Sequence, residues 1–509
     1  MIPADSTRPT APTGQPRPTG RARFTTRQLS KRQALKWTVF FVLAPGIFAS
    51  LMDEIGVFQA LPRIADGFGS TIPQVQWVVL AYVLTIGALM VPMGRLSDIV
   101  GRRRVYMAGL AVFALGGLLA GLAPSLTALI LFKVLQGVGG AMIQATAMAL
   151  VAGAFPARER GRAIGLFMLV AGAGGALGPI AGGAAVTYLG WRWMFFMSVP
   201  LVVGALALAA IALPRHKRKI QGVREPFDWA GALLATMTLV VFLLVMSNGS
   251  QWGWTAARSL AGFAVAGVAL VALVAWQRRA RWPLIPPELF RKSVFTRGVV
   301  LTLLIIVGNT PAFFLMPFLL QGVMHRSPLA AGLVMSCAAV AATATGMTAG
   351  YLSDRHDWRI FVVAGTAAII AVLIGVSFVG ETTPLWILVV LMFGLGLGVG
   401  LWYTPTTSAA LGAVPKSRYG VGSSVAHLAR YTASLSAITL ATTVVAVTMS
   451  SLGFEPTLDL ADSAESSGLG GAFVSGMSVA VRIGAAITFA AMLIALLPLG
   501  LRRSLRRQR

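Results

Sequence analysis

Long apolar runs alternate with short polar segments along the chain. A helix needs about 20 apolar residues to cross the core of a bilayer, so each run predicts one membrane-spanning helix. The predicted spans lie at about 37–60, 73–93, 105–123, 127–150, 162–187, 194–213, 229–248, 258–277, 297–321, 329–352, 359–379, 385–405, 420–450 and 477–500. The pattern predicts an all-α polytopic membrane protein with about fourteen spans and both termini on one side.

The composition agrees with a membrane location. Of 509 residues, 56% are hydrophobic and 11% are charged, whereas soluble domains carry about 25% charged residues. The net charge of +26 suggests nucleic acid as a partner, but the basic residues lie in short segments between apolar runs and therefore indicate topology. We expect membrane lipid and a small-molecule substrate as partners, and no nucleic acid.

The charges of the loops indicate the orientation. Loops on one side contain basic clusters such as Arg102 to Arg104 and Arg215 to Lys219. On the other side, the predicted loop from Ser451 to Gly476 contains carboxylates and no Lys or Arg. Because basic loops remain in the cytoplasm, we predict cytoplasmic termini and a location in the cytoplasmic (inner) membrane.

Asp53 and Glu54 are adjacent carboxylates in the outer part of the first apolar run. A carboxylate at membrane depth costs a few kcal/mol, so a chain that keeps two is expected to use at least one. Adjacent helix residues point about 100° apart, so the two cannot both face the centre of one cavity. The alternative for each is a side chain that reaches the headgroups or stays neutral.

An internal repeat divides the chain. Gly94-Arg-Leu-Ser-Asp98 follows the second span, and Gly350-Tyr-Leu-Ser-Asp354 follows the tenth, 256 residues later. Secondary transporters are commonly built from repeated halves with a substrate site between them. The same offset relates Asp53 to Asn309. The predicted parts are a disordered basic tail, a six-helix bundle, two inserted helices, a second six-helix bundle and a basic tail, at 1–36, 37–213, 229–277, 297–501 and 502–509.

The segment from Gly94 to Arg103 resembles the signature loop between spans 2 and 3 of the major facilitator superfamily. Its glycines permit a tight turn and close helix approach. Breakable contacts of its charged residues are expected to latch one conformation. The candidate latch residues are Gly94, Asp98, Gly101, Arg102, Arg103 and Asp354.

A second motif lies in the fifth span and is similar to the motif of the family's antiporters. It contains Gly174, Gly178, Pro179, Gly182 and Gly183. Small residues four apart let helices touch backbone to backbone, and the proline removes one bond of the helix ladder. Ordinary helix packing is the alternative.

The first and fourth spans resemble the fourteen-span drug:proton antiporter branch of this family. Asp53 and the closing Ala60-Leu-Pro62 match its first-span signature, and the resemblance implies a role for Asp53 in proton coupling. Lys133 stands where the family usually has Arg. A desolvated Lys can lose its proton, whereas Arg stays charged. The candidate proton-coupling residues are Asp53, Glu54 and Lys133, although Lys133 alternatively snorkels to the outer face.

The depths of Asp53 and Lys133 predict that they meet. Asp53 lies nine residues before Pro62, and Lys133 lies six residues after Thr127, near the outer ends of spans 1 and 4. At about 1.5 Å per residue, both lie roughly 9–14 Å below the outer boundary. We expect the two side chains to approach within salt-bridge or water-bridged distance in at least one state.

Polar and aromatic residues in the spans are candidates for a substrate cavity. They are Phe58, Gln59, Gln136, Asn309, Phe313, Trp402 and Tyr403. An aromatic site of this kind suits lipophilic cations. The alternatives for these residues are helix packing and contact with lipid.

The resemblance implies proton-coupled efflux of small amphipathic compounds by alternating access. Export of a lipid, amino acid or other metabolite is the alternative within transport, and a membrane-embedded enzyme or a non-transporting sensor lies outside it. The sequence has no metal-ligand spacing, nucleotide loop or nucleophile triad, so no metal, cofactor or catalytic residue is expected, and the proton gradient is the expected energy source.

Overall fold

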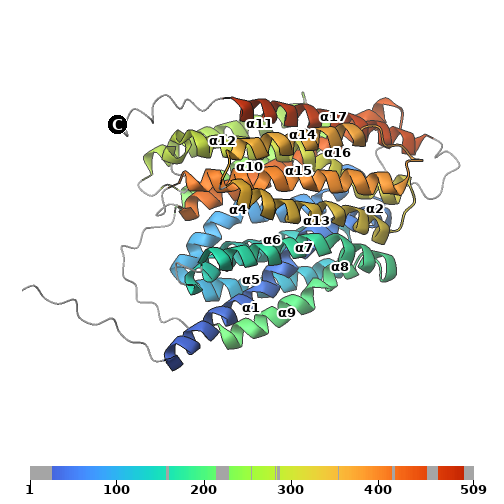
Figure 1. Cartoon of the computed structure of the whole chain (residues 1–509). Coiled ribbons are helices and arrows are strands. Elements are labelled where there is room, and N and C mark those ends of the chain that lie inside the picture. Colours follow the sequence, from blue (N-terminus) through green and yellow to red (C-terminus); the bar gives the residue numbers. More distant parts are fainter. Residues whose placement is uncertain are drawn as a thin grey trace, which may run out of the picture.

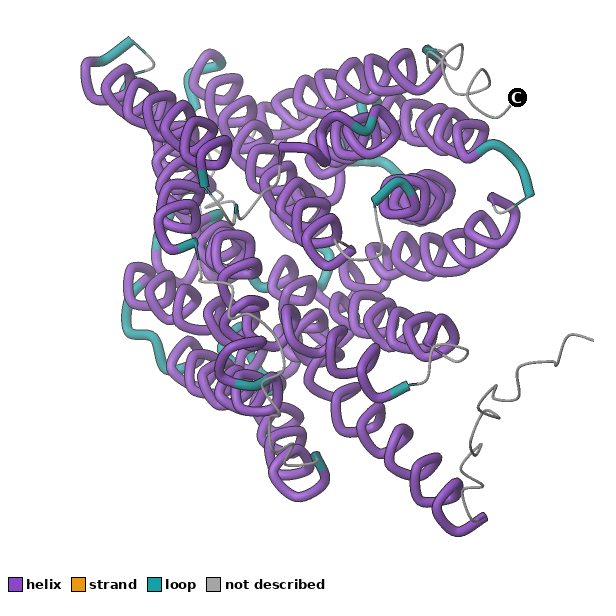
Figure 2. Tube along the Cα trace, turned by 90° about the vertical axis from the view of Figure 1, so that its left-hand side faces the viewer, coloured by secondary structure: helices purple, strands orange, loops and turns teal. Residues whose placement is uncertain are grey.

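The computed structural model consists of helices joined by loops in the part of the chain that it describes (Figure 1 and Figure 2). The described residues are 26–155, 160–213, 228–253, 255–280, 283, 287–353, 355–414, 419–454 and 468–497. The helices of the first half are α1 (Thr26–Gly56), η1 (Val57–Gln59), α2 (Leu61–Phe68), α3 (Ile72–Val75), α4 (Trp77–Val100), α5 (Arg102–Gly121), α6 (Leu126–Ala154), α7 (Arg160–Tyr188), α8 (Trp193–Phe196) and α9 (Ser198–Ala212). They are followed by α10 (Trp229–Trp252), α11 (Ala257–Arg279), η2 (Pro287–Arg291), α12 (Ser293–Phe318), η3 (Leu319–Val323), α13 (Pro328–Ser353), α14 (Trp358–Val376), α15 (Leu385–Gly412), α16 (Tyr419–Ser451) and α17 (Leu469–Leu496).

The helices follow the predicted spans in number and order. In the described residues, 13 helices are long and apolar enough to cross a membrane. α10 has 24 residues, and its apolar segment Trp229–Phe242 occupies the position of the seventh predicted span. α1 begins and α17 ends at the left of Figure 1, as an even number of crossings requires. We call this the terminal end of the bundle and the opposite one the distal end.

Two bundles with equivalent internal packing form the two halves of the molecule. α4 and α5 both pack on α6 in the N-terminal half, as α13 and α14 pack on α15 in the C-terminal half. Between the halves, α7 packs on α13 and α16 packs on α4. α4 and α13 are equivalent helices of the two halves, and each packs on a helix of the other half. The repeat seen in the sequence is therefore present in the packing.

The inserted helices α10 and α11 lie beside one of the two interfaces between the halves. α10 packs against α16 and α4, and α11 packs on α10. Asp228 ties the pair together, because its carboxylate accepts hydrogen bonds from Trp276 Nε1 at 2.7 Å and Gln277 Nε2 at 3.0 Å. The two helices therefore form a hairpin attached to the α4–α16 side.

Two boundaries differ from the prediction. α1 begins at Thr26, so residues 26–36, predicted as part of a disordered tail, are helical; this segment is rich in Gln, Lys, Arg and Leu, which favour helix. α17 begins at Leu469 rather than near 477, because the glycines and serines of its first turns weaken the hydropathy signal. Parts of the predicted tails, loops and bundles lie outside the described residues, at 1–25, 156–159, 214–227, 415–418, 455–467 and 498–509.

Candidate functional site

Asp53 and Lys133 form a buried ion pair inside the N-terminal half. Asp53 lies in α1 and Lys133 in α6, and Lys133 Nζ is 2.9 Å from Asp53 Oδ2. Both side chains are 0% exposed. The approach predicted from their depths is therefore confirmed. Either charge alone would be strongly unfavourable in this environment, so each stabilises the other.

Further groups surround this pair. Gln136, one turn along α6, accepts a hydrogen bond from the Lys133 ammonium at 2.6 Å. The rings of Tyr82 and Phe195 have centroids 4.4 and 5.3 Å from the same nitrogen. Because an amide oxygen and two ring faces also stabilise the cation, the ammonium keeps favourable contacts when the Asp53 carboxylate is protonated.

Sequence analysis did not single out Ser198, Tyr82 or Phe195 as site residues. Ser198 Oγ, at the start of α9, donates to Asp53 Oδ1 at 3.4 Å. Tyr82 and Phe195 lie in apolar runs, where nothing distinguishes a ring that faces a cation from one that faces lipid.

Glu54 points away from this pair, toward the C-terminal half. Its Oε2 accepts from Gln144 Nε2 of α6 at 3.2 Å, and Gln144 Oε1 accepts from the Tyr431 hydroxyl of α16 at 2.6 Å. Gln144 Nε2 also lies 3.4 Å from Ser50 Oγ, one turn before Glu54 on the same face of α1. We call Glu54, Gln144 and Tyr431 the cross-half chain, because it connects the two bundles.

An aromatic layer joins the halves on the distal side of Glu54. The ring of Phe58 packs edge-on against Phe313 and Phe314 of α12, with centroids 5.8 and 5.9 Å away. Phe58 and Phe314 are separated by the 256-residue offset of the repeat, so this contact joins equivalent positions of the halves. Phe58 and Phe313, predicted to line a cavity, here pack together between the halves.

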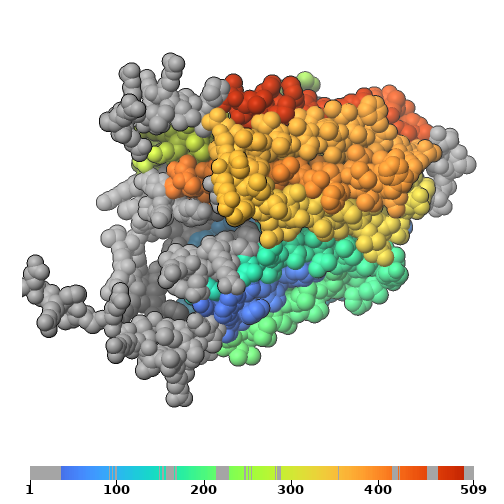
Figure 3. Space-filling model, in the orientation of Figure 1, coloured from blue at the N-terminus to red at the C-terminus, as the bar shows by residue number. Residues whose placement is uncertain are grey.

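Gln59 extends the same layer with polar contacts. It is fully buried, and its Nε2 donates to Met335 Sδ of α13 at 2.7 Å. Its backbone oxygen accepts from Gln321 Nε2 of η3 at 3.1 Å. The two halves are therefore closed against each other at the distal end, where Figure 3 shows yellow and orange helices meeting teal and green ones along a continuous seam.

The glycine motif of α7 brings α7 and α1 into backbone contact. Gly174, Gly178 and Gly182 follow one another at intervals of four residues along the face toward α1. A methyl group on Gly178 would lie 2.8 Å from the carbonyl oxygen of Met52, next to Asp53. The close approach that the sequence predicts from this spacing is present.

The same motif also contacts the other half. Gly183 packs against the backbone of Pro328, and the carbonyl of Pro179 packs against Gly332. Both partners belong to α13. The motif thus provides one face for packing within a half and another for the interface between halves.

The segment predicted as a latch turns the chain from α4 into α5. Gly101 has φ +111°, a conformation that favours glycine. Arg103 Nη2 donates to the carbonyl oxygen of Ala210 at 2.8 Å, near the C-terminus of α9, where a cation is favourable. The latch remains a prediction, because the Asp98 side chain and all of Asp354 lie outside the described residues. The other predicted residues, beside this turn, are Gly94 and Arg102.

The remaining cavity candidates are separated. Gln136 belongs to the ion-pair cluster within the N-terminal half. Trp402 is 1% exposed, and its backbone nitrogen packs against Gly365 of α14, within the C-terminal half. Tyr403 and Asn309 are half-buried. These helices are apolar on all sides, so the sequence alone does not determine their rotation.

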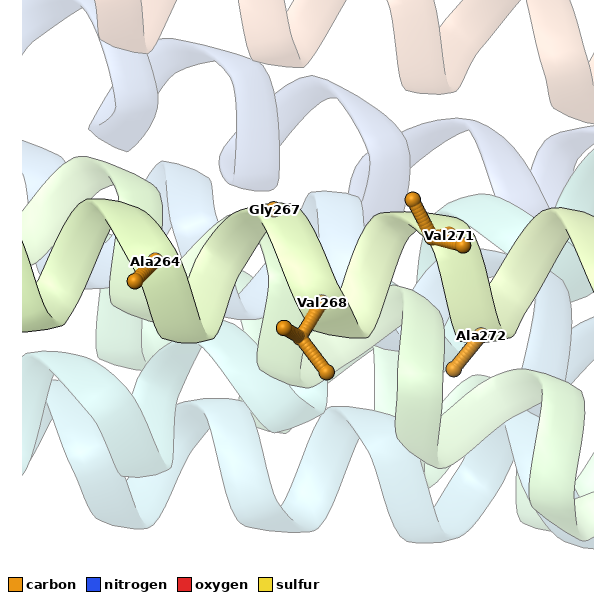
Figure 4. A pocket seen from close by; sticks show the side chains of 5 residues that line it. All are labelled: Ala264, Gly267, Val268, Val271 and Ala272. Atoms are coloured by element: carbon orange, nitrogen blue, oxygen red, sulfur yellow. The ribbon is translucent and has the colours of Figure 1, made fainter.

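A shallow hollow on α11 is too apolar to orient a polar substrate. It is lined by Ala264, Gly267, Val268, Val271 and Ala272 (Figure 4). These side chains offer no hydrogen-bonding group, and the surface suits a lipid chain.

A family model matches most of this architecture. The model of the Major Facilitator Superfamily aligns with residues 43–438, which include the ion pair, the glycine motif and the cross-half chain. The chain belongs to the Major Facilitator Superfamily. It is therefore a transporter rather than an enzyme.

Relatives within the superfamily include a riboflavin transporter and a multidrug resistance protein. The riboflavin transporter RibZ of Clostridioides difficile is 31% identical over 76% of this chain and 84% of its own length. The multidrug resistance protein Stp of Mycobacterium tuberculosis is 31% identical over 82% of this chain and 77% of its own. A solved POT family peptide transporter, 15% identical, superposes with a TM-score of 0.65 over 91% of this chain and 97% of its own, which shows the shared fold. The match to a multidrug resistance protein agrees with the drug:proton antiporter branch.

Proposed function

We propose that this protein exports small amphipathic compounds from the cytoplasm in exchange for protons. The buried pair of Asp53 and Lys133 carries the proposal, because charged side chains at membrane depth are energetically costly and typically serve a function. The multidrug resistance relative supports efflux as the direction of transport.

The pair is suited to proton exchange. Protonation of Asp53 removes its attraction for Lys133 and weakens the contact between α1 and α6. Gln136 and the surrounding rings still hold the ammonium, so the change in charge does not leave a bare cation. α1 runs on from Asp53 directly into η1, which carries Phe58 and Gln59, and the contacts of these two residues close the distal end. A change in the packing of α1 is thereby transmitted to the closure between the halves.

Export of a metabolite is the second candidate, and the riboflavin transporter among the relatives supports a metabolite as the cargo. Both candidates share the proton-driven mechanism and differ in cargo. Proteoliposomes loaded with members of a chemically diverse panel, with and without a pH gradient, separate them. Gradient-dependent transport of several unrelated amphipathic compounds supports drug efflux, while transport of a single metabolite supports the alternative. Equal rates with and without the gradient would contradict proton coupling.

We also propose that both termini are cytoplasmic, from the basic and acidic loops. In a Cys337→Ser background, Ser463→Cys should react with an impermeant thiol reagent added to intact cells, and Ser504→Cys should not. Both positions lie outside the described residues, in the acidic loop and the basic tail. The reverse labelling pattern would overturn the orientation.

A further inference from the structure

Two faces of α1 have different surroundings. Ala49 and Asp53 of α1 and Val57 of η1, spaced by four residues, are at most 1% exposed, and Asp53 pairs with Lys133 inside the N-terminal half. Glu54 belongs to the neighbouring face, one turn before Phe58, which contacts α12 of the other half. Glu54 therefore presents a carboxylate to the space between the halves, next to the closed distal layer.

A basic side chain of the other half lies across this space. Arg430 precedes Tyr431 in α16, and its guanidinium lies 4.4 Å from the centre of the Tyr431 ring. Through the cross-half chain, Tyr431 connects Arg430 to Glu54. The charges of Glu54 and Arg430 attract each other, but among the described residues no ion pair of 4.0 Å or less joins them.

The guanidinium also retains an unused donor. The Nε of Arg430 is buried and makes no hydrogen bond to any described residue. A buried donor without a partner is unfavourable, particularly on a charged group at membrane depth. Native structures usually satisfy such a group with a ligand or water, so the unused donor marks a place where a bound acceptor would be stabilised.

We propose that the transported compounds include amphipathic zwitterions, whose anionic group binds Arg430 and whose cationic group binds Glu54. The planar guanidinium suits a carboxylate, which it can bind through two parallel hydrogen bonds. A lipophilic cation without an anionic group would leave Arg430 unpaired and would be repelled by it. The inference rests on the proposed function in taking the space between the halves as the substrate site, and it adds the charge pattern of the substrate.

Binding to the purified full-length protein tests the charge pattern directly. Rhodamine 110 carries a delocalised cation and a free carboxylate, and rhodamine 123 is its methyl ester, so the pair differs only in the anionic group. Fluorescence polarisation in detergent, without a pH gradient, gives both affinities. The wild-type protein should bind rhodamine 110 about tenfold more tightly or better. Equal affinities, or tighter binding of the ester, would overturn the proposal.

Substitutions assign the two charges. Arg430→Gln should remove the preference by weakening binding of rhodamine 110 without weakening that of rhodamine 123, and Glu54→Gln should weaken binding of both dyes about tenfold. Arg192→Gln is the matched control, because Arg192 also lies over an aromatic ring, Trp191, at 4.3 Å but belongs to the distal surface of one half. It should leave both affinities unchanged. Equal loss of both dyes in Arg430→Gln would contradict the assignment.

Two further measurements keep the test decisive. If Arg430→Gln does not fold, Arg430→Lys retains the cation and should keep a reduced preference for rhodamine 110. A complete loss of that preference in a folded Lys variant with normal affinity for rhodamine 123 would contradict the role of the charge.

Transport in proteoliposomes separates this inference from the proposed function. Gradient-driven export without any preference between the dyes would refute the inference alone, and the dye preference without gradient-driven export would refute proton coupling alone.

Discussion

Asp53 makes its contacts within the N-terminal half, whereas Glu54, the next residue, contacts side chains that connect to the C-terminal half. The first carboxylate is 0% exposed and pairs with a lysine. The second is half-buried and bonds to a neutral amide, Gln144, which in turn bonds to Tyr431. One helix thus carries one carboxylate inside a bundle and one at the interface between bundles.

The difference suggests separate tasks for the two carboxylates. A sealed ion pair changes its energy strongly when one member gains a proton, because little water is present to screen the change. A carboxylate between two moving bodies, in contrast, can contact a substrate and sense whether the halves are apart. α1 connects the two positions rigidly. A proton that binds Asp53 and a substrate that binds Glu54 therefore act on the same helix.

The largest expected effect concerns Asp53, the carboxylate inside the N-terminal half. Asp53→Asn removes the titrating group, so gradient-driven efflux from proteoliposomes should fall to background while binding of rhodamine dyes remains measurable. Asp66→Asn is the control, since Asp66 pairs with Arg63 at 3.8 Å on the exposed surface. It should transport normally. Gradient-driven efflux by Asp53→Asn at the wild-type rate would refute the coupling role.

Breaking the pair from the lysine side should affect stability. Lys133→Met leaves the Asp53 carboxylate buried without a cation to pair with and should cost about 3–5 kcal/mol of unfolding free energy in detergent. Arg63→Met breaks the exposed pair with Asp66 and should cost about 1 kcal/mol or less.

The double variant Asp53→Asn with Lys133→Met distinguishes an unpaired charge from a cavity. It should recover much of the lost stability, because no charge is then left unpaired. A double variant as unstable as Lys133→Met would show that lost packing, rather than charge, explains the effect.

The sequence predicted the ion pair but not its surroundings. Depth can be counted along an apolar run, so Asp53 and Lys133 could be placed at the same level without knowing how either helix is rotated. The rotation of a helix about its own axis can be predicted only where one face is polar, and helices surrounded by lipid and protein have almost no polar face. Gln136 was therefore expected in the cavity between the halves, although it lies beside Lys133 within one half.

The aromatic layer at the distal end shows the same limit of prediction from sequence. Phe58 and Phe313 could be named as aromatic candidates, but whether they face a cavity, lipid or each other depends on the relative position of the halves. That position is a property of one conformation, and the proposed alternating-access cycle requires the same sequence to adopt others. The cross-half chain, formed by groups that are each ordinary in a membrane helix, also had no sequence signal beyond Glu54.

Two glycines of α7 separate packing within a half from packing between halves. Gly178→Ala places a methyl group 2.8 Å from the Met52 carbonyl and should destabilise the protein by about 1–3 kcal/mol. Gly183→Ala acts at the contact with Pro328 and should instead favour separation of the distal ends. Gly204→Ala is the control, because nothing lies within 4 Å of its added carbon.

A distance between spin labels at Leu189→Cys and Arg326→Cys, in a Cys337→Ser background, reports this separation. Both positions are exposed at the distal end, one in each half. Gly183→Ala should lengthen the distance and Gly178→Ala should leave it unchanged. An unchanged distance in both variants would contradict the division of the motif into two faces.

The smallest expected effect concerns one hydroxyl group of the cross-half chain. Tyr431→Phe removes the 2.6 Å hydrogen bond to Gln144, which joins the two halves in the distally closed conformation. Tyr106→Phe removes a comparable buried bond, 3.2 Å to the Leu43 carbonyl, but within the N-terminal half. A neutral hydrogen bond contributes about 1 kcal/mol, so each variant should lose a similar amount of stability. Only Tyr431→Phe should also shift the spin-label populations toward the separated state, by about fivefold. Equal populations in the two variants would mean that this bond does not help to hold the halves together, and the interface side of α1 would then lack the mechanical connection that distinguishes Glu54 from Asp53.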